Sequence, residues 1–447
     1  MTNKGDNMII IRTDFDKTVK KMKPMPGVGQ PPFYGIDNKM FHYLTEAGIP
    51  YSRLHDVAGD YGGGRFVDVP NIFRNFDADP YDPASYDFVF TDWLITELVK
   101  AGCEPYYRLG ITIENDADMR AYHTEPPADF HKWAVICEHI IAHYNEGWAN
   151  GYHYHITYWE IWNEPDGTVP GFPYKAELWN GTPEQFYELY DVAAKHLKSR
   201  FGDTIKIGGY ACTGLRGIFM TPEQLKGTRE ELFLNFFKGF FRFIKQHNSP
   251  IDFFSWHTYN TVDQMIELEK YLQEQLKLFG YEGLENHINE WNPVHNERGT
   301  ARHNAHILAC MIAMQNAHVE EMNIYDARYG VSSYAALFNP ANAHPFPAYY
   351  GMVAFNELYK LGTETLTEIY TCDENFSAGE AIYALSASDG NSRKTIIVNL
   401  SDKERTLSYE KDEPIYHNAW VIDEEHLLGW TPTIKCLKPY QALLIEW

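Results

Sequence analysis

A regular alternation of short β-rich runs with longer amphipathic segments constrains the fold of this chain most. The apolar runs have strand length, and the segments between them repeat apolar residues at helical spacing. The predicted strands are Val28–Gln30, Tyr51–His55, Pro105–Leu109, Thr157–Trp162, Ile205–Gly209, Phe253–His257, His287–Glu290 and Met322–Asp326. The predicted helices are Asn38–Ala47, Tyr86–Lys100, Lys132–Tyr144, Pro183–Arg200, Arg229–Gln246, Val262–Leu278, Arg302–Ala317 and Ala348–Leu361.

Eight β–α units in roughly 330 residues have the count and length of a (β/α)8 TIM barrel with inserted loops. A doubly wound open sheet also alternates strands and helices. That fold usually carries a Gly-rich turn after its first strand, and the sequence has no such turn there. We therefore predict an α/β protein with a closed barrel.

The pattern changes near residue 362. Ala381–Ser386, Lys394–Asn399 and Ala442–Trp447 alternate or run apolar at strand length, and turn residues separate them. We expect a small C-terminal β-sandwich, which the N-terminal run Met8–Arg12 can join as a further strand. The predicted domains are residues 14–361 for the catalytic barrel, and residues 1–13 plus 362–447 for the accessory β-sandwich.

Charge and cysteine content exclude several classes of function. The 447 residues carry a formal net charge of −23, whereas nucleic acids and anionic membrane surfaces attract positively charged proteins. We therefore expect neither as a partner. The cysteines form no C-x-x-C pair and no dense framework, so buried reduced thiols are favoured. These cysteines are Cys103, Cys137, Cys212, Cys310, Cys372 and Cys436.

The N-terminal residues do not read as a targeting segment. Their only apolar run, Met8–Ile11, is too short for the core of a signal peptide. No apolar stretch is long enough to span a bilayer. We expect a cytoplasmic location, or a secreted protein from which a signal has been removed.

The sharpest local signal is the segment Tyr158-Trp159-Glu160-Ile161-Trp162-Asn163-Glu164-Pro165-Asp166. Glu164 ends a β-rich run, and the carboxyl ends of barrel strands carry the active sites of this fold. The amide of Asn163 can bind a sugar 2-hydroxyl, and Trp162 could line the pocket and desolvate a general acid. Taken alone, an Asn-Glu-Pro segment would more often be an ordinary start of a helix.

A second signal is Ile288-Asn289-Glu290-Trp291, where another Glu closes a short β-rich run. Glu164 and Glu290 would end strands four and seven, which face each other across the mouth of a closed barrel. Retaining glycosidases need two carboxyl groups about 5–5.5 Å apart, one to donate a proton and one to attack the anomeric carbon. The pair therefore predicts glycoside hydrolysis.

Four motifs in this order resemble the 4/7 superfamily of glycoside hydrolases, also called clan A. Within it, residues 28–359 resemble glycoside hydrolase family 39, the family of β-xylosidases and α-L-iduronidases. The motifs are Arg53-Leu54-His55, Trp162-Asn163-Glu164-Pro165, Phe254-Ser255-Trp256-His257-Thr258-Tyr259 and Asn289-Glu290-Trp291. The resemblance implies carbohydrate metabolism by a retaining xylosidase-like hydrolase.

Residue by residue, the resemblance implies that Glu164 is the acid/base and Glu290 the nucleophile. The resemblance also implies residues that bind the sugar or hydrogen-bond the nucleophile. These residues are Asn163, His55, His257, Tyr259, Arg53 and Trp291. Arg53 would keep the nucleophile ionised, because a nearby cation lowers the pKa of a carboxyl group. Arg53 could equally form a buried structural ion pair, and His257 could be a satisfied core histidine.

The sequence departs from the family pattern at Asp56, where xylosidases usually have Gly, and in the unfamiliar loop Tyr61–Arg65. These departures bear on the substrate more than on the mechanism. We expect an exo-acting β-xylosidase-like enzyme that needs no cofactor or metal and acts on an oligosaccharide or glycoside. An arabinosidase or β-galactosidase is the alternative, and a uronic acid would need a cation such as Arg328.

Two further expectations stay open. A non-catalytic carbohydrate-binding barrel is the alternative from another class of function. The resemblance also allows a homo-oligomer, but the sequence fixes neither the number of subunits nor the linkage that is cleaved.

Overall fold

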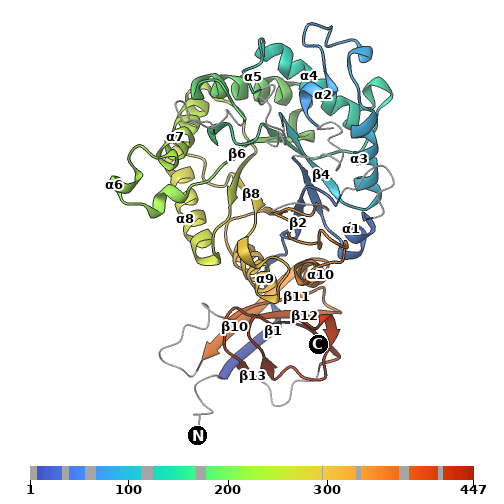
Figure 1. Cartoon of the computed structure of the whole chain (residues 1–447), viewed down its shortest axis with the longest axis vertical. Coiled ribbons are helices and arrows are strands. Elements are labelled where there is room, and N and C mark those ends of the chain that lie inside the picture. The colour runs from blue at the N-terminus through green and yellow to red at the C-terminus, as the bar shows by residue number, and fades with distance from the viewer. Residues whose placement is uncertain are drawn as a thin grey trace.

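A computed structural model of the chain describes residues 8–32, 40–55, 67–111, 124–167, 178–293, 295–328, 334–371, 382–410 and 416–447. Asp56, the loop 61–65 and Cys372 lie outside these ranges. In Figure 1 a barrel ringed by helices stands above a β-domain that contains the C-terminal end of the chain. No helix in the described ranges has the length and apolar character to cross a membrane.

Eight parallel strands close into a barrel, which confirms the predicted fold class. In order around the barrel they are β2 (Gly27–Gly29), β3 (Tyr51–Leu54), β4 (Glu104–Leu109), β5 (Tyr158–Ile161), β6 (Lys206–Cys212), β7 (Phe253–Thr258), β8 (Glu285–Trp291) and β9 (Glu321–Tyr325). β9 pairs with β2 and completes the closure.

The helices that surround the barrel start where the sequence provides capping residues. Thr182, before α5, accepts a hydrogen bond from Gln185 N–H, and Pro183 occupies the first turn. The helices are α1 (His42–Ala47), α2 (Val69–Ile72), α3 (Val89–Lys100), α4 (Phe130–Asn145), α5 (Pro183–Phe201), α6 (Pro222–Leu225), α7 (Arg229–His247), α8 (Val262–Phe279), α9 (Ala301–Asn316) and α10 (Pro347–Tyr359). The buried side chains of α7 are all apolar and recur at helical spacing, so one face packs on the barrel.

The remaining strands form a single mixed sheet rather than two separate sheets. Its order is β15 (Leu427–Trp430), β14 (Asn418–Ile422), β17 (Ala442–Glu446), β12 (Arg393–Asn399), β11 (Ile382–Ser388), β10 (Thr363–Thr371), β1 (Met8–Lys21), β13 (Arg405–Tyr409) and β16 (Cys436–Leu437). Val421 on β14 and Leu437 on β16 belong to one apolar cluster although their strands lie near opposite ends of the sheet. The sheet therefore curls around its own core, which agrees with the predicted accessory β-domain.

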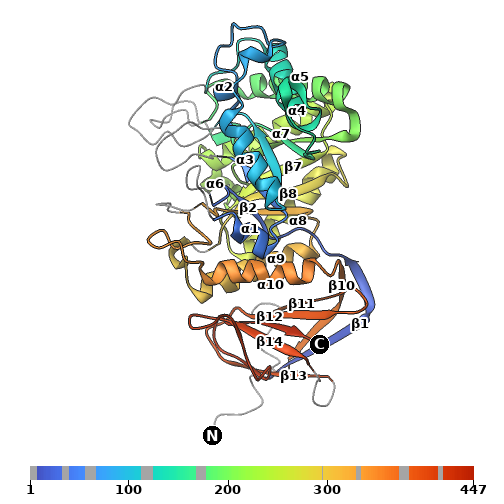
Figure 2. The same ribbon diagram turned by 90° about the vertical axis from the view of Figure 1, so that its right-hand side faces the viewer.

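The other face of this sheet packs against α9 and α10, as Figure 2 shows for α10 above β11 and β12. Alternation along the strands separates the two cores: Ile396 and Val398 join the barrel core, whereas Ile397 joins the core of the curled sheet. β1 stays in the sheet through Lys21. We propose that the two units divide there and near residue 361.

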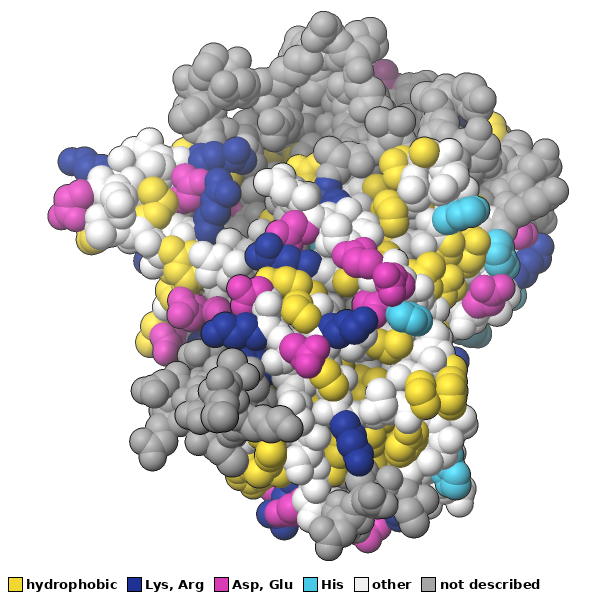
Figure 3. Space-filling model, turned by 60° about the horizontal axis from the view of Figure 1, so that its bottom comes forward, with side chains coloured by type: hydrophobic (Ala, Val, Ile, Leu, Met, Phe, Trp, Pro, Cys, Tyr) yellow, Lys and Arg dark blue, Asp and Glu magenta, His cyan; other side chains and the backbone are white. Residues whose placement is uncertain are grey.

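The face in Figure 3 carries basic and acidic side chains next to one another over the described residues. The net charge of −23 is thus not gathered into a single acidic patch on this face. Apolar side chains lie between the charged ones.

Candidate active site

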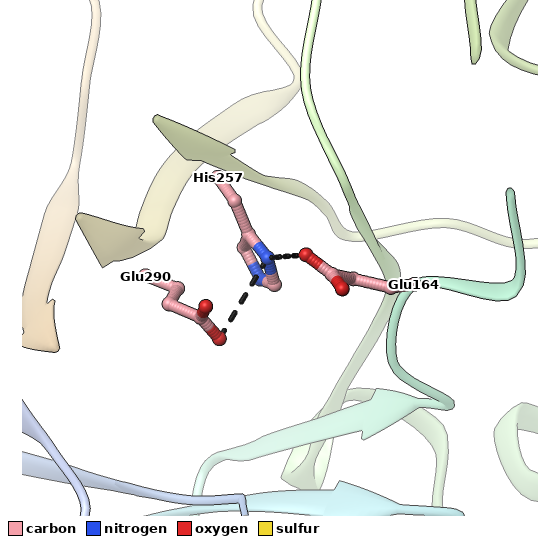
Figure 4. A group of neighbouring side chains, drawn as sticks. All are labelled: Glu164, His257 and Glu290. Carbon is pink, nitrogen blue, oxygen red and sulfur yellow. Dashed lines mark hydrogen bonds and ion pairs between the residues drawn. The ribbon is translucent and has the colours of Figure 1, made fainter. Parts of the chain in front are cut away.

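Glu164 and Glu290 meet at the carboxyl ends of their strands, as the sequence predicted. Glu164 follows β5 and Glu290 lies near the end of β8. A carboxylate oxygen of each and one ring nitrogen of His257 all lie within 4.8 Å of one another. Figure 4 shows the imidazole between the two carboxyl groups.

A β-bulge in β8 directs the side chain of Glu290 into the barrel. Opposite β7, the register shifts so that Trp256 pairs with Ile288 while His257 pairs with Glu290, which leaves Asn289 as an extra residue in β8. In a regular strand Asn289 and Glu290 would point to opposite faces. The bulge allows both to point into the barrel.

A similar irregularity follows β5. Trp162 and Glu164 both have positive φ, 71° and 45°, which non-glycine residues adopt mainly where surrounding contacts enforce it. Trp162 packs against Trp133 and Trp179, and its indole N–H donates to Leu178 O. Trp162 therefore contributes to the packing between β5 and its helices, and it also lines a pocket with Ile111 and Trp133. That it desolvates the acid stays a prediction.

Glu290 is surrounded by donors. Tyr259 O–H donates to Oε1 at 2.5 Å, and Arg53 Nη1 donates to Oε2 at 3.3 Å. Burial nevertheless raises the pKa of Glu290, and the nearby Glu164 adds to the rise, while His257, Arg53 and Tyr259 oppose it. Arg53 thus favours the ionised form, as expected, but does not overcome burial.

His257 is positioned to share a proton with the predicted acid. Its Nδ1 lies 2.6 Å from Oε1 of Glu164 and 3.7 Å from Oε2 of Glu290. Burial lowers the pKa of His257 to about 4, so the ring is neutral near neutral pH. A neutral ring donates to an ionised Glu164 and accepts from a protonated one.

Beneath the carboxylates lies a buried network that sequence reasoning missed. Arg53 Nε and Nη2 both donate to Oε2 of Glu160, at 2.9 and 2.7 Å. Ser255 and Asn289 donate to the other carboxylate oxygen of Glu160. Both interpretations of Arg53 therefore hold, because the same guanidinium forms a buried ion pair and contacts Glu290.

Asn163 has a donor left over for a ligand. Its Oδ1 accepts a hydrogen bond of 2.5 Å from Arg53, which fixes the orientation of the amide. Its Nδ2 is buried and has no hydrogen-bond partner among the described residues. The indole N–H of Trp291 is likewise buried and unpartnered within the described ranges. His55 is buried directly after β3.

Glu164, His257 and Glu290 also have the spacing of a metal-binding group. The Arg53 guanidinium, 3.3 Å from Glu290, would repel a cation placed between them. Tyr259 and Arg53 already occupy both oxygens of Glu290. We therefore do not assign these side chains as metal ligands.

The family model described as "Glycosyl hydrolases family 39" matches residues 40–407. The chain belongs to this family. The match confirms the predicted family.

The sequence of this family 39 member matches a curated relative over only part of its length. A β-xylosidase of Caldicellulosiruptor saccharolyticus is 26% identical over 226 residues, which are 48% of this chain and 38% of the relative. The chain thus spans well under half of the length of this curated relative.

Solved structures share the fold over nearly the whole chain. A glucosidase from Croceicoccus marinus has a TM-score of 0.75 at 17% identity, and 99% of each chain is covered. A monomeric β-xylosidase from Caulobacter crescentus has a TM-score of 0.67 at 17% identity, with 98% of this chain and 99% of that chain covered.

Proposed function

We propose that this family 39 member is a retaining exo-glycosidase, with Glu164 as the acid/base and Glu290 as the nucleophile. The observation that carries the proposal is the separation of at most 4.8 Å between an oxygen of each carboxyl group. Two oxygens this close can reach one anomeric carbon, as the close pair of carboxyl groups of a retaining enzyme must.

In the first step Glu290 attacks the anomeric carbon while the glycosidic C–O bond breaks and Glu164 protonates the departing oxygen. Tyr259 and Arg53 hold the attacking carboxylate in place through their hydrogen bonds to it. Glu164 then removes a proton from water, whose oxygen replaces Glu290 at the anomeric carbon. The sugar leaves with its original anomeric configuration.

The positions of His257 and Asn163 support this division of roles. His257 contacts Glu164 in either protonation state, so it can keep the carboxyl group oriented as the proton leaves and returns. The unpartnered Nδ2 of Asn163 is available for the sugar 2-hydroxyl, a contact that strengthens in the transition state.

For the sugar, we propose a β-xyloside first, which the name of the Caldicellulosiruptor relative supports. Arabinosides and β-galactosides are the alternatives on the same catalytic groups. A uronic acid ranks below them, because Arg328, the cation nominated for its carboxylate, already lies 3.4 Å from Asp326.

A panel of nitrophenyl glycosides tests both the sugar and the roles. We expect turnover by the wild type, a loss of about 10²–10⁴-fold for Glu164→Gln on poor leaving groups, and a loss of at least about 10³-fold for Glu290→Gln. Glu282→Gln, at a side chain that is 73% exposed, is the matched control and should keep wild-type rates.

Two results would contradict the proposal. Activity that survives Glu290→Gln would remove its role as nucleophile, and a first-released sugar of inverted anomeric configuration by NMR would exclude double displacement. A wild type that binds sugars but hydrolyses none of the panel would favour the non-catalytic barrel.

A further inference from the structure

The turn that carries Glu164 is tied to the end of β6 at two levels. The backbone N–H of Glu164 donates to Ala211 O at 3.1 Å. Two residues later, the carboxylate of Asp166 accepts hydrogen bonds from Thr213 Oγ1 at 2.6 Å, from Thr213 N at 3.2 Å and from Cys212 Sγ at 3.3 Å. Asp166 is only 2% exposed, so this is a buried clamp between the two strand ends.

The clamp holds backbone that is strained on both sides. Glu164 has φ of 45°, and Ala211, its partner on β6, has φ of 56°. Non-glycine residues keep such conformations only where neighbouring contacts enforce them. Asp166 lies in the one-turn helix Pro165–Gly167, which directly follows Glu164.

We propose that Asp166 is a positioning residue for Glu164, which fixes the turn that carries the acid/base. This inference rests on the proposed role of Glu164. Asp166 itself touches neither substrate nor reacting atoms in this proposal.

The burial of Asp166 favours a role through hydrogen bonds rather than through charge. Burial raises the pKa of Asp166 to about 7, and the charge of Glu164 contributes to the rise. Among the described residues, the titratable groups facing Asp166 are Glu164 on its own turn, Tyr210 and Cys212 on β6, and Tyr187 on α5. The buried side chains of α7, which also packs against this turn, are all apolar.

None of these groups is a cation that would hold Asp166 ionised, so its carboxyl group is mostly protonated below about pH 7. Its effect on Glu164 therefore comes from the turn that its hydrogen bonds fix. Glu164 must deliver its proton to the departing oxygen. A displaced turn should therefore slow most the leaving groups that need protonation.

The test compares kcat/KM of Asp166→Asn on two glycosides of the sugar that the panel selects. A 2,4-dinitrophenyl leaving group needs little protonation, whereas a 4-nitrophenyl or alkyl leaving group needs more. We expect a loss of roughly 10–100-fold on the poorer leaving groups and of less than about threefold on the dinitrophenyl glycoside.

Thr213→Val removes one donor to Asp166 and should change the same two measurements in the same direction but less, while Thr213→Ser should restore them. These two variants test the same proposal if Asp166→Asn folds poorly. Asp203→Asn, at a fully exposed side chain, is the matched control and should match the wild type.

Equal losses on both leaving groups would mean a purely structural role and would overturn the proposal, as would unchanged rates. Glu164→Ala is measured in parallel. If the loss in Glu164→Ala did not depend on the leaving group, the proposed role of Glu164 itself would be wrong. If that loss did depend on the leaving group while the loss in Asp166→Asn did not, only the proposal for Asp166 would be wrong.

Discussion

Arg53 and Glu160 form an ion pair in which each side chain is at most 1% exposed, with Nη2 and Oε2 2.7 Å apart. The same guanidinium reaches Glu290 and Asn163. Charges this deeply buried are costly unless they are paired and hydrogen-bonded. The pair therefore positions one cation between a structural carboxylate and the predicted nucleophile.

Glu160→Gln should destabilise the protein because Arg53 loses its full ionic partner while remaining buried. Removal of one member of a buried pair typically costs about 3–5 kcal/mol. Urea unfolding should show this decrease in the free energy of unfolding, and kcat/KM should fall as Arg53 shifts. The exposed Glu282→Gln should change neither, and a neutral result for Glu160→Gln would contradict the role of the pair.

Tyr259→Phe should move the acidic limb of the kcat/KM profile to higher pH. The pKa of Glu290 is already raised by burial, and the Tyr259 hydroxyl opposes that rise. Without this donor the pKa rises further, so the carboxyl group ionises only at higher pH. A hydrogen bond to a charged group contributes about 1.5–3 kcal/mol, which corresponds to roughly 10–100-fold in kcat/KM.

The control is Tyr81→Phe, which alters a hydroxyl on a side chain that is 65% exposed. Its pH profile should superimpose on that of the wild type. A Tyr259→Phe variant with an unshifted acidic limb would show that the hydroxyl does not tune Glu290.

The sequence was sufficient to predict the barrel because its strands are short β-rich runs that alternate with segments of helical periodicity. The buried ion pair of Glu160 could also have been predicted. A charge within the buried run Tyr158–Ile161 needs a partner, and Arg53 lies within another buried strand.

Other features of the site could not be predicted from the sequence alone. Strand alternation alone predicts that Glu160, Trp162 and Glu164 share a face, and the positive φ of Trp162 breaks that pattern. The clamp of Asp166 depends on Thr213, from the next strand, and nothing in local sequence joins them. β13 to β16 were missed because they are short and irregularly spaced.

His303→Gln should make stability less dependent on pH. His303 is buried with Nε2 2.9 Å from Asn292 Oδ1, and burial lowers its pKa to about 3. Between pH 3 and the unfolded value of about 6.5, the unfolded chain binds a proton that the folded protein does not. The free energy of unfolding therefore falls as the pH falls through this window and is unaffected by this residue above it.

Urea unfolding at pH 7, 6 and 5 checks this expectation. The wild type should lose about 1.4 kcal/mol per pH unit more than the variant below pH 6.5, since one proton is involved. His344→Gln, at an exposed position, should leave the slope unchanged. Equal slopes for His303→Gln and the wild type would exclude the effect.

Ile11→Ala should weaken the curled sheet from within. Ile11 is 1% exposed and belongs to the core that the sheet encloses. Truncation of a buried Ile typically costs about 2–5 kcal/mol, to be measured by urea unfolding. Val19→Ala on the same strand, where the side chain is 45% exposed, should cost far less.

The position of β1 has a consequence for how the chain is made. β1 pairs with β10 and β13, strands that follow the entire barrel in sequence. During synthesis, residues 8–21 leave the ribosome before the barrel, whereas the strands that satisfy their backbone groups leave after it. This segment therefore remains without these β-partners until residues 363–409 emerge, and such distant pairing is intrinsically slow.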